Sequence, residues 1–197
     1  DTGFLVFNRA TYPQLVRLFD QLAVPTAASE MSFSVQVPDH GLEWSGCNLD
    51  TVFAQRRNLL RPRFLGMLAD LLRFNRLCTG IAEAQAEASL QQPIEAFLAE
   101  HRFSAAFRDW YLLPMLGCIW SCPTDQMLRF PVATMIRFCH NHGLIRVTDR
   151  PQWYTVAGGS REYVQRLLAG IPDARLSTPV RALRRVPPGS GQAGVWL

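Results

Sequence analysis

The residues with the plainest chemical capacity are cysteines and histidines in the second half of the chain. Cys118 and Cys122 are four positions apart, near one face of an expected helix. Cys139, His140 and His142 form a second group further along. Tetrahedral zinc takes four such ligands, but structural sites pair them at short spacings, and a proline directly after Cys122 breaks the helix here. Because free cysteine is common in helical cores, we expect no metal, and a zinc-stapled helical domain stays the alternative.

Nucleophilic catalysis is the second chemistry to weigh. Any of the five cysteines could pair with a distant histidine, but none follows a Gly-rich turn at the start of a helix, where a thiol becomes reactive. Ser160 follows two glycines, yet the surrounding Ala-Gly-Gly-Ser-Arg lacks the Gly-x-Ser-x-Gly elbow of serine hydrolases. The sequence therefore disfavours a hydrolase.

The junction Gly158-Gly159-Ser160 is the most informative local feature. It joins an expected strand to an expected helix, and two residues without side chains let another group approach the backbone. The N-terminus of the helix would favour negative charge at the same place. A tight turn with Ser160 as the N-cap of the helix explains the same residues without a ligand. Taken alone, the local sequence leaves both interpretations open.

Antiparallel strands are expected toward both ends of the chain, with helices between them. Apolar alternation predicts strands, and apolar residues three and four apart predict helices. The expected strands cover residues 4–7, 31–37, 144–147, 153–156, 180–186 and 194–197, and a returning strand follows a turn at residues 39–41. The expected helices cover residues 12–23, 62–78, 93–101, 104–120 (kinked at Pro114), 124–127, 131–142 and 161–169. The fold class is therefore α+β, with a helical block of residues 50–143 between strands in residues 1–49 and 144–197.

The composition is that of a globular protein whose positive charge is spread along the chain. Hydrophobic residues make up 48% and charged residues 18%, with a net charge of +4 that comes entirely from arginine. Arginines alternate with acidic residues instead of forming a basic block, so we expect no nucleic-acid partner. No signal peptide and no run of the ~18–20 apolar residues of a membrane span is visible, which favours a cytoplasmic protein with reduced thiols. Both ends fall inside apolar segments, which indicates a piece of a longer protein.

Several short motifs occur in a characteristic order. They are Asp1-Thr2-Gly3-Phe4, Tyr12-Pro13-x-Leu15, Met31-Ser32-Phe33-Ser34, Asn58-Leu59-Leu60-Arg61-Pro62-Arg63-Phe64, Leu113-Pro114-Met115 through Ile119-Trp120-Ser121, Arg137-Phe138-Cys139-x-Asn141-His142-Gly143, Arg150-Pro151-Gln152-Trp153 and Val156-x-Gly158-Gly159-Ser160-x-Glu162-Tyr163. With these motifs the chain resembles, over essentially its whole length, the predicted bacterial NAD/FAD-binding proteins. These form a branch of the flavin-containing amine oxidase and phytoene-desaturase-like superfamily.

The resemblance implies a substrate-side domain fragment of an FAD-dependent, amine-oxidase-like oxidoreductase. In that family a G-x-G-x-x-G unit that binds FAD precedes such a segment and another flavin-binding segment follows it; neither occurs in residues 1–197. The implied reaction is hydride transfer to flavin from an apolar or amphipathic, small-molecule or lipid-like substrate. FAD is expected in the full-length protein, not on the fragment alone, and no side chain is implied as acid, base or nucleophile.

The resemblance also implies where cofactor and substrate would lie. The residues expected to approach the flavin are Asp1, Thr2, Gly3, Phe4, Gly158, Gly159 and Ser160. Val180 is expected to hold the adenine through the backbone of a strand. The helical block would roof the substrate cavity, with Trp120 and Trp153 as wall residues.

Two expectations concern partners and one concerns the alternative function. Strands that would pair with a missing FAD domain have open edges, so the fragment is expected to self-associate through residues 180–197. Association with a membrane surface stays open, without support in the sequence. The alternative function is a non-catalytic binding or scaffold module that keeps the fold without redox chemistry.

Overall fold

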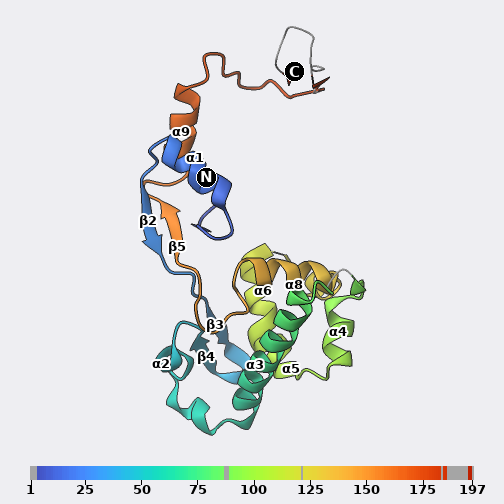
Figure 1. The fold of residues 1–197 in the computed structure, drawn as a ribbon. Coiled ribbons are helices and arrows are strands. Elements are labelled where there is room, and N and C mark those ends of the chain that lie inside the picture. Colours follow the sequence, from blue (N-terminus) through green and yellow to red (C-terminus); the bar gives the residue numbers. More distant parts are fainter. Residues whose placement is uncertain (1–3, 87–88, 121, 183, 186–194, 197) are drawn as a thin grey trace.

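The chain folds into a small lobe and a larger lobe joined by a narrow neck (Figure 1). The computed structural model describes residues 4–86, 89–120, 122–182, 184–185 and 195–196. Helices and strands both contribute, as the α+β expectation requires. Each lobe has its own hydrophobic core, so the two must be considered separately.

The small lobe is a three-stranded antiparallel sheet with one helix between its first two strands and another after its last strand. Its elements are β1 (Phe7–Asn8), α1 (Pro13–Gln21), β2 (Thr26–Ser29), β5 (Trp153–Val156) and α9 (Arg161–Ala169), and the strand order is β1-β5-β2. Helix α1 begins with a proline in its first turn, where no backbone donor is needed, and it buries Phe19. Phe19 packs with Phe7, Val24 and Val156 in the core of this lobe.

The pairing of β2 with β5 forms the neck. These strands run antiparallel from the pair Thr26–Val156 to the pair Ser29–Trp153. Residues 30–152, which make up the larger lobe, therefore leave and return at one point of the sheet. Figure 1 shows β2 and β5 side by side above this lobe.

The larger lobe begins with the expected hairpin and continues as a helical block. Strands β3 (Ser34–Val37) and β4 (Leu42–Ser45) are joined by η1 (Pro38–His40), and Gly41 turns the chain at φ +53°. The helices are α2 (Leu49–Val52), η2 (Arg56–Leu60), α3 (Pro62–Glu83), α4 (Ile94–Glu100), α5 (Ala105–Phe107), η4 (Arg108–Leu112), α6 (Leu113–Trp120), α7 (Thr124–Leu128) and α8 (Val132–Asn141). The block thus lies close to the expected residues 50–143.

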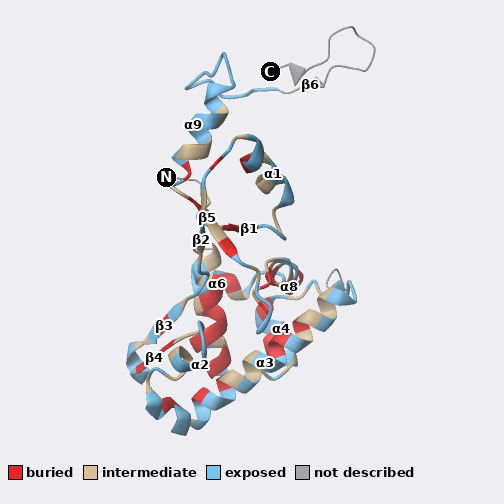
Figure 2. Ribbon diagram, turned by 60° about the vertical axis from the view of Figure 1, so that its left-hand side comes forward, coloured by how far each residue is buried: buried red, intermediate tan, exposed pale blue. Residues whose placement is uncertain are grey.

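Helix α3 is the central helix of this block. Its buried side chains include Phe64, Met67, Phe74 and Cys78, which recur at helical spacing along one face. Figure 2 shows that buried residues concentrate in α6 and on parts of α3 and α8. The core therefore lies where these three helices meet the β3–β4 hairpin.

The helix is irregular in the turn before Pro114, whereas the sequence predicted a kink at Pro114 itself. Segments α5, η4 and α6 follow one another without a break; η4 is a π-helical turn that ends two residues before Pro114, the second residue of α6. A proline has no N–H to donate to the carbonyl four residues earlier, which here belongs to Trp110. The indole N–H of Trp44, on β4, donates to that carbonyl at 3.2 Å. The widened turn thus accommodates the proline, and the hairpin satisfies the freed acceptor.

Two expected strands are largely absent, and one observed strand was not expected. Residues 144–147 form turns and bends instead of a strand, because the chain reverses at Gly143 (φ +67°) and Ile145 turns into the core. Of residues 4–7, only Phe7 belongs to a strand, β1. Strand β2 was not expected, since Thr-Ala-Ala-Ser has no apolar alternation; its pairing with β5 creates it. Local pattern alone therefore misses a strand that a distant partner specifies.

The end of the chain contains a short two-stranded sheet. Strands β6 (Arg184–Arg185) and β7 (Val195–Trp196) pair antiparallel, and residues 186–194 between them lie outside the described residues. The region expected to self-associate thus contains paired strands in its described part. Self-association through residues 180–197 itself stays a prediction.

Truncating a side chain in the core of the helical block should lower the free energy of unfolding far more than truncating one on the surface of the same block. Leu116 on α6 is fully buried, whereas Leu72 on α3 is about half exposed. We expect Leu116→Ala to lower the free energy of unfolding by about 2–5 kcal/mol, because it removes buried methyl groups and leaves a cavity. Leu72→Ala should change it by less than about 1 kcal/mol. Urea unfolding of both variants measures the difference, and equal losses would contradict this assignment of the core.

Candidate functional site

The Gly158-Gly159 loop lies between β5 and α9 with an exposed backbone. Both glycines have left-handed φ angles, +87° and +88°, that other residues adopt only with strain. The N–H of Gly159 donates to the carbonyl of Val156 at 3.0 Å, and the N–H of Glu162 donates back to Gly159 at 3.1 Å. A Cβ on Gly158 would lie 3.0 Å from Cγ of Glu162. The loop is therefore tight, free of side chains, and bordered by one carboxylate.

Ser160 connects this loop to the first described residue of the chain. It is buried, and its hydroxyl donates to the carbonyl of Phe4 at 3.2 Å. It occupies the N-cap position of α9 but makes no capping hydrogen bond with its side chain. The expected tight turn with Ser160 as the N-cap residue is therefore confirmed in position, but the hydroxyl does not cap the helix and instead binds a segment 156 residues away.

Phe4 lies in an aromatic cluster beside the loop. Its ring stacks on Tyr163 of α9 at 5.7 Å between centroids and on Phe19 of α1 at 6.1 Å. Four expected site residues, Phe4, Gly158, Gly159 and Ser160, thus come together in the small lobe. The other three on this side, Asp1, Thr2 and Gly3, lie outside the described residues.

Val180 is not placed with these residues. It is 63% exposed and lies in no strand, so the expected strand at this position is wrong. Figure 1 shows the chain after α9 running away from the small lobe. Residues 170–182 contain turns, bends and loop but no helix or strand, since Pro, Asp, Gly and Ser interrupt any regular pattern here.

Trp120 and Trp153 lie at the two ends of a row of rings. Trp120 packs against Phe138 (5.1 Å between centroids), Phe138 stacks on His142 (4.0 Å), and His142 stacks on Trp153 (6.4 Å). Two surface hollows of the larger lobe, of about 540 and 490 Å³, are lined by α3 and its neighbours, and neither is lined by Trp120 or Trp153. The two tryptophans share an aromatic layer between the lobes.

The layer is completed by a contact between Tyr12 and His142 that the sequence did not predict. The Nδ1 atom of His142 lies 2.8 Å from the carbonyl of Phe138, which can only accept, so Nδ1 carries a proton. In the neutral ring, Nε2 then accepts from the hydroxyl of Tyr12 at 2.8 Å. Close by, Thr11 donates to the carbonyl of Asn141 at 2.8 Å. These bonds join the small lobe to the end of α8, and no sequence spacing could show a contact across 130 residues.

The cysteines are arranged as core and surface residues. Cys78 and Cys139 are buried, Cys47 and Cys118 are exposed, and Cys122 is intermediate. Burial raises the pKa of Cys139 to about 12, and burial together with the nearby Cys139 raises the pKa of Cys78 further. Cys118 lies on α6, which ends at Trp120 before Cys122, so the two do not share a helix face as expected.

No group of three or more histidine, cysteine, aspartate or glutamate side chains that could hold a metal occurs among the described residues. Within the same residues no helix is both long and apolar enough to cross a membrane. The Gly158-Gly159 loop offers exposed backbone groups at the junction of β5 and α9. The neighbouring carboxylate of Glu162 and the rings of Phe4 and Tyr163 favour a flat, uncharged group over a phosphate.

Comparison of the chain with protein-family models and with curated proteins found no match.

The thiols should divide into two classes of reactivity. In the native protein at mildly alkaline pH, Cys47 and Cys118 should be alkylated quickly, because only the exposed thiolate reacts. Cys78 and Cys139 should react only after denaturation, since burial both shields them and raises their pKa. Peptide mass spectrometry after iodoacetamide treatment reads out each site, with a denatured sample as the control in which all five react. Rapid native alkylation of Cys139 would contradict this.

The hydrogen bond between the lobes should be visible in the pH dependence of stability. Burial raises the pKa of Tyr12 above its ordinary value of 10.0. The stability that the protonated Tyr12 hydroxyl contributes is therefore fully present below pH ~10 and is lost as the pH rises through the pKa of the folded state. Tyr12→Phe should lower the free energy of unfolding by about 0.5–1.5 kcal/mol at neutral pH and by less at higher pH. Urea unfolding at neutral and alkaline pH measures this.

Tyr154→Phe is the matched control, because its hydroxyl makes no hydrogen bond with another of the described residues. It should leave the stability at neutral pH nearly unchanged. If the two variants lose the same amount, the bond between Tyr12 and His142 contributes nothing.

Proposed function

We propose that the chain is the substrate-side part of an FAD-dependent oxidoreductase of the amine-oxidase type. The substrate would be an apolar or amphipathic molecule, and FAD, when bound, would accept a hydride from it. In this proposal a nucleotide-binding unit outside residues 1–197 supplies most of the FAD site. The substrate class, small-molecule or lipid-like, is part of the proposal.

The observation that carries the proposal is the meeting of Phe4 with the Gly158-Gly159 loop. These segments stand at opposite ends of the lobe's sequence, and the hydrogen bond from Ser160 to the Phe4 carbonyl joins them. In the resembling family both segments approach the flavin ring. Two segments that contact the same flavin ring must lie next to each other, and Phe4 and the Gly158-Gly159 loop do so here.

The residues at this place fit the ring portion of FAD by their chemistry. Exposed backbone at Gly158 and Gly159 allows a flat ring to approach without side-chain obstruction. Polar backbone groups can form hydrogen bonds with the ring's carbonyl and N–H groups, and the Phe4 and Tyr163 rings provide apolar surroundings. Glu162, whose side chain borders the loop, would repel a pyrophosphate, so this loop would contact the ring and not the phosphates.

Binding of FAD tests the proposal. We expect the complete gene product that contains this chain to retain a flavin absorption band after purification, and the 197-residue chain alone to retain none. In the complete protein, Gly159→Val should weaken FAD binding by about tenfold or more, because a branched side chain is strained at φ +88° and fills the approach to the loop.

Gly66→Val is the matched control, because Gly66 is an exposed position on α3 with open space around the position of a Cβ. It should leave flavin binding unchanged, and circular dichroism should show both variants folded. A complete protein that stays colourless after refolding with FAD would overturn the proposal and favour the non-catalytic binding module. Bleaching of bound flavin by a candidate substrate would in turn exclude that alternative.

A further inference from the structure

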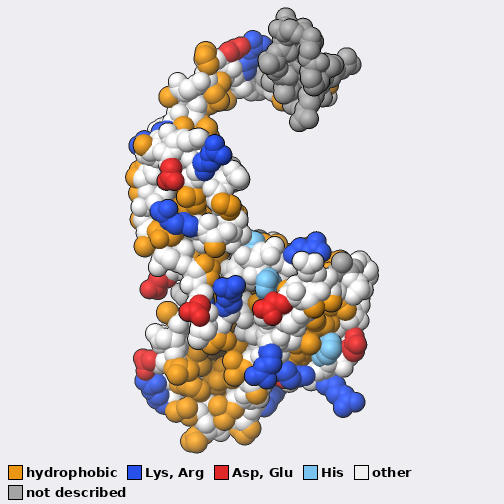
Figure 3. All heavy atoms as spheres, viewed as in Figure 1, with side chains coloured by type: hydrophobic (Ala, Val, Ile, Leu, Met, Phe, Trp, Pro, Cys, Tyr) orange, Lys and Arg blue, Asp and Glu red, His pale blue; other side chains and the backbone are white. Residues whose placement is uncertain are grey.

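The turn between α2 and α3 presents apolar side chains at the far end of the larger lobe. Leu60 and Leu59, both in η2, are 87% and 49% exposed, and Leu49 on α2 is 78% exposed. Leu65 on the first turns of α3 is partly exposed as well. We call these four leucines the apolar tip. Figure 3 shows hydrophobic side chains gathered over this end of the molecule, with basic side chains on both sides and an acidic side chain beside the left-hand ones.

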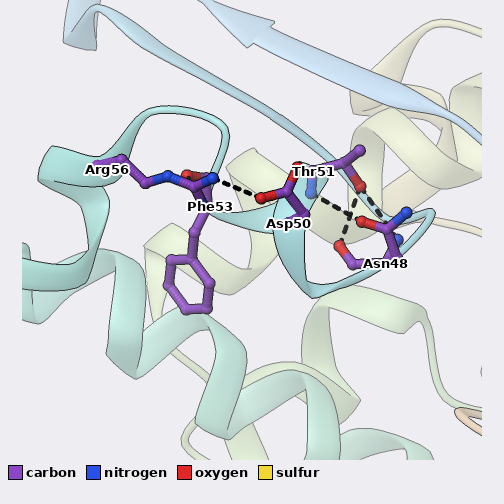
Figure 4. A network of polar contacts seen from close by, with 5 residues as sticks. All are labelled: Asn48, Asp50, Thr51, Phe53 and Arg56. Carbon is purple, nitrogen blue, oxygen red and sulfur yellow. Dashed lines mark hydrogen bonds and ion pairs between the residues drawn. The ribbon is translucent and has the colours of Figure 1, made fainter.

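The segment that carries the apolar tip is held by local hydrogen bonds. Asn48 caps α2: its side chain accepts from the N–H of Thr51 at 2.9 Å, and the Thr51 hydroxyl accepts from the N–H of Asn48 at 3.0 Å. Arg56 forms an ion pair with Asp50 and donates to the carbonyl of Phe53 at 3.2 Å (Figure 4). The exposure of the leucines is therefore imposed by a structured turn rather than by a loose loop.

Three arginines beside the apolar tip keep their positive charge available. Arg57 donates to the carbonyl of Gly41, and Arg61 donates to the carbonyl of His40 at 3.4 Å. Arg63 lies over the ring of Trp110 at 5.0 Å. Carbonyl oxygens and an aromatic face orient a guanidinium without neutralising it, unlike the carboxylate that pairs with Arg56.

We propose that the apolar tip inserts into the surface of a bilayer that contains anionic lipids, with Arg57, Arg61 and Arg63 at the level of the headgroups. Exposed leucines gain free energy on entering the acyl region, and arginines near the surface gain attraction to acidic lipids. The combination of apolar apex and basic flanks therefore favours a lipid surface. This inference is independent of flavin binding.

Co-sedimentation with lipid vesicles tests the inference. The 197-residue chain should bind vesicles of phosphatidylcholine with phosphatidylglycerol at least about tenfold more strongly than vesicles of phosphatidylcholine alone. High salt should reduce this preference, because it screens the headgroup charge. Leu60→Asn alone should weaken binding several-fold, and the pair Leu59→Asn with Leu60→Asn should weaken it by about tenfold or more. Arg57→Gln with Arg61→Gln should remove most of the preference for anionic lipid.

Two variants elsewhere on the surface serve as matched controls. Leu176→Asn replaces a leucine that is as exposed as Leu60, and Arg17→Gln removes one charge from an exposed position on α1. Both should bind vesicles like the unchanged chain, and thermal unfolding should show that every variant is folded. Absence of binding to anionic vesicles, or binding that the tip variants leave unchanged, would overturn the inference. Loss of a dimer in light scattering on Leu60→Asn, without vesicle binding, would overturn it in favour of a contact between two copies.

Discussion

The antiparallel pairing of β2 with β5 is the constraint on which the rest of the structure depends. At one end of this pairing Ser29 faces Trp153, so the whole helical lobe leaves and returns between two neighbouring residues. At the other end β5 continues into the Gly158-Gly159 loop, and Ser160 directly after this loop is hydrogen-bonded to Phe4. Without this pairing neither the lobe nor the candidate site would have its position.

Within the larger lobe a proline determines how the hairpin meets the helices. Pro114 leaves the carbonyl of Trp110 without its helical donor, and Trp44 on the hairpin supplies the replacement. This bond lies in the core that α3, α6 and α8 share. The helix thus tolerates a proline because a tertiary contact supplies a hydrogen-bond donor to the carbonyl that the proline leaves without one.

The parts of the fold that the sequence predicted well are those set by local patterns. The β3–β4 hairpin, helix α9 and the reversal at Gly143 follow from alternation, helical spacing and a glycine stop. Strand β2, the role of Ser160 and the bond between Tyr12 and His142 depend on partners more than a hundred residues away, and no spacing encodes them. The glycine loop could be selected as a candidate site from sequence, but its neighbours could not.

The narrow neck also makes the larger lobe a portable unit. Because Ser29 and Trp153 are adjacent, residues 30–152 have their two ends side by side and their own hydrophobic core. A segment of this kind can be acquired or exchanged between two strands of a host sheet without disturbing the host's pairing. A different larger lobe could then be fitted to the same sheet by replacing a single continuous stretch of chain, and the contacts that Thr11, Tyr12 and Trp153 make with Asn141 and His142 would have to be rebuilt.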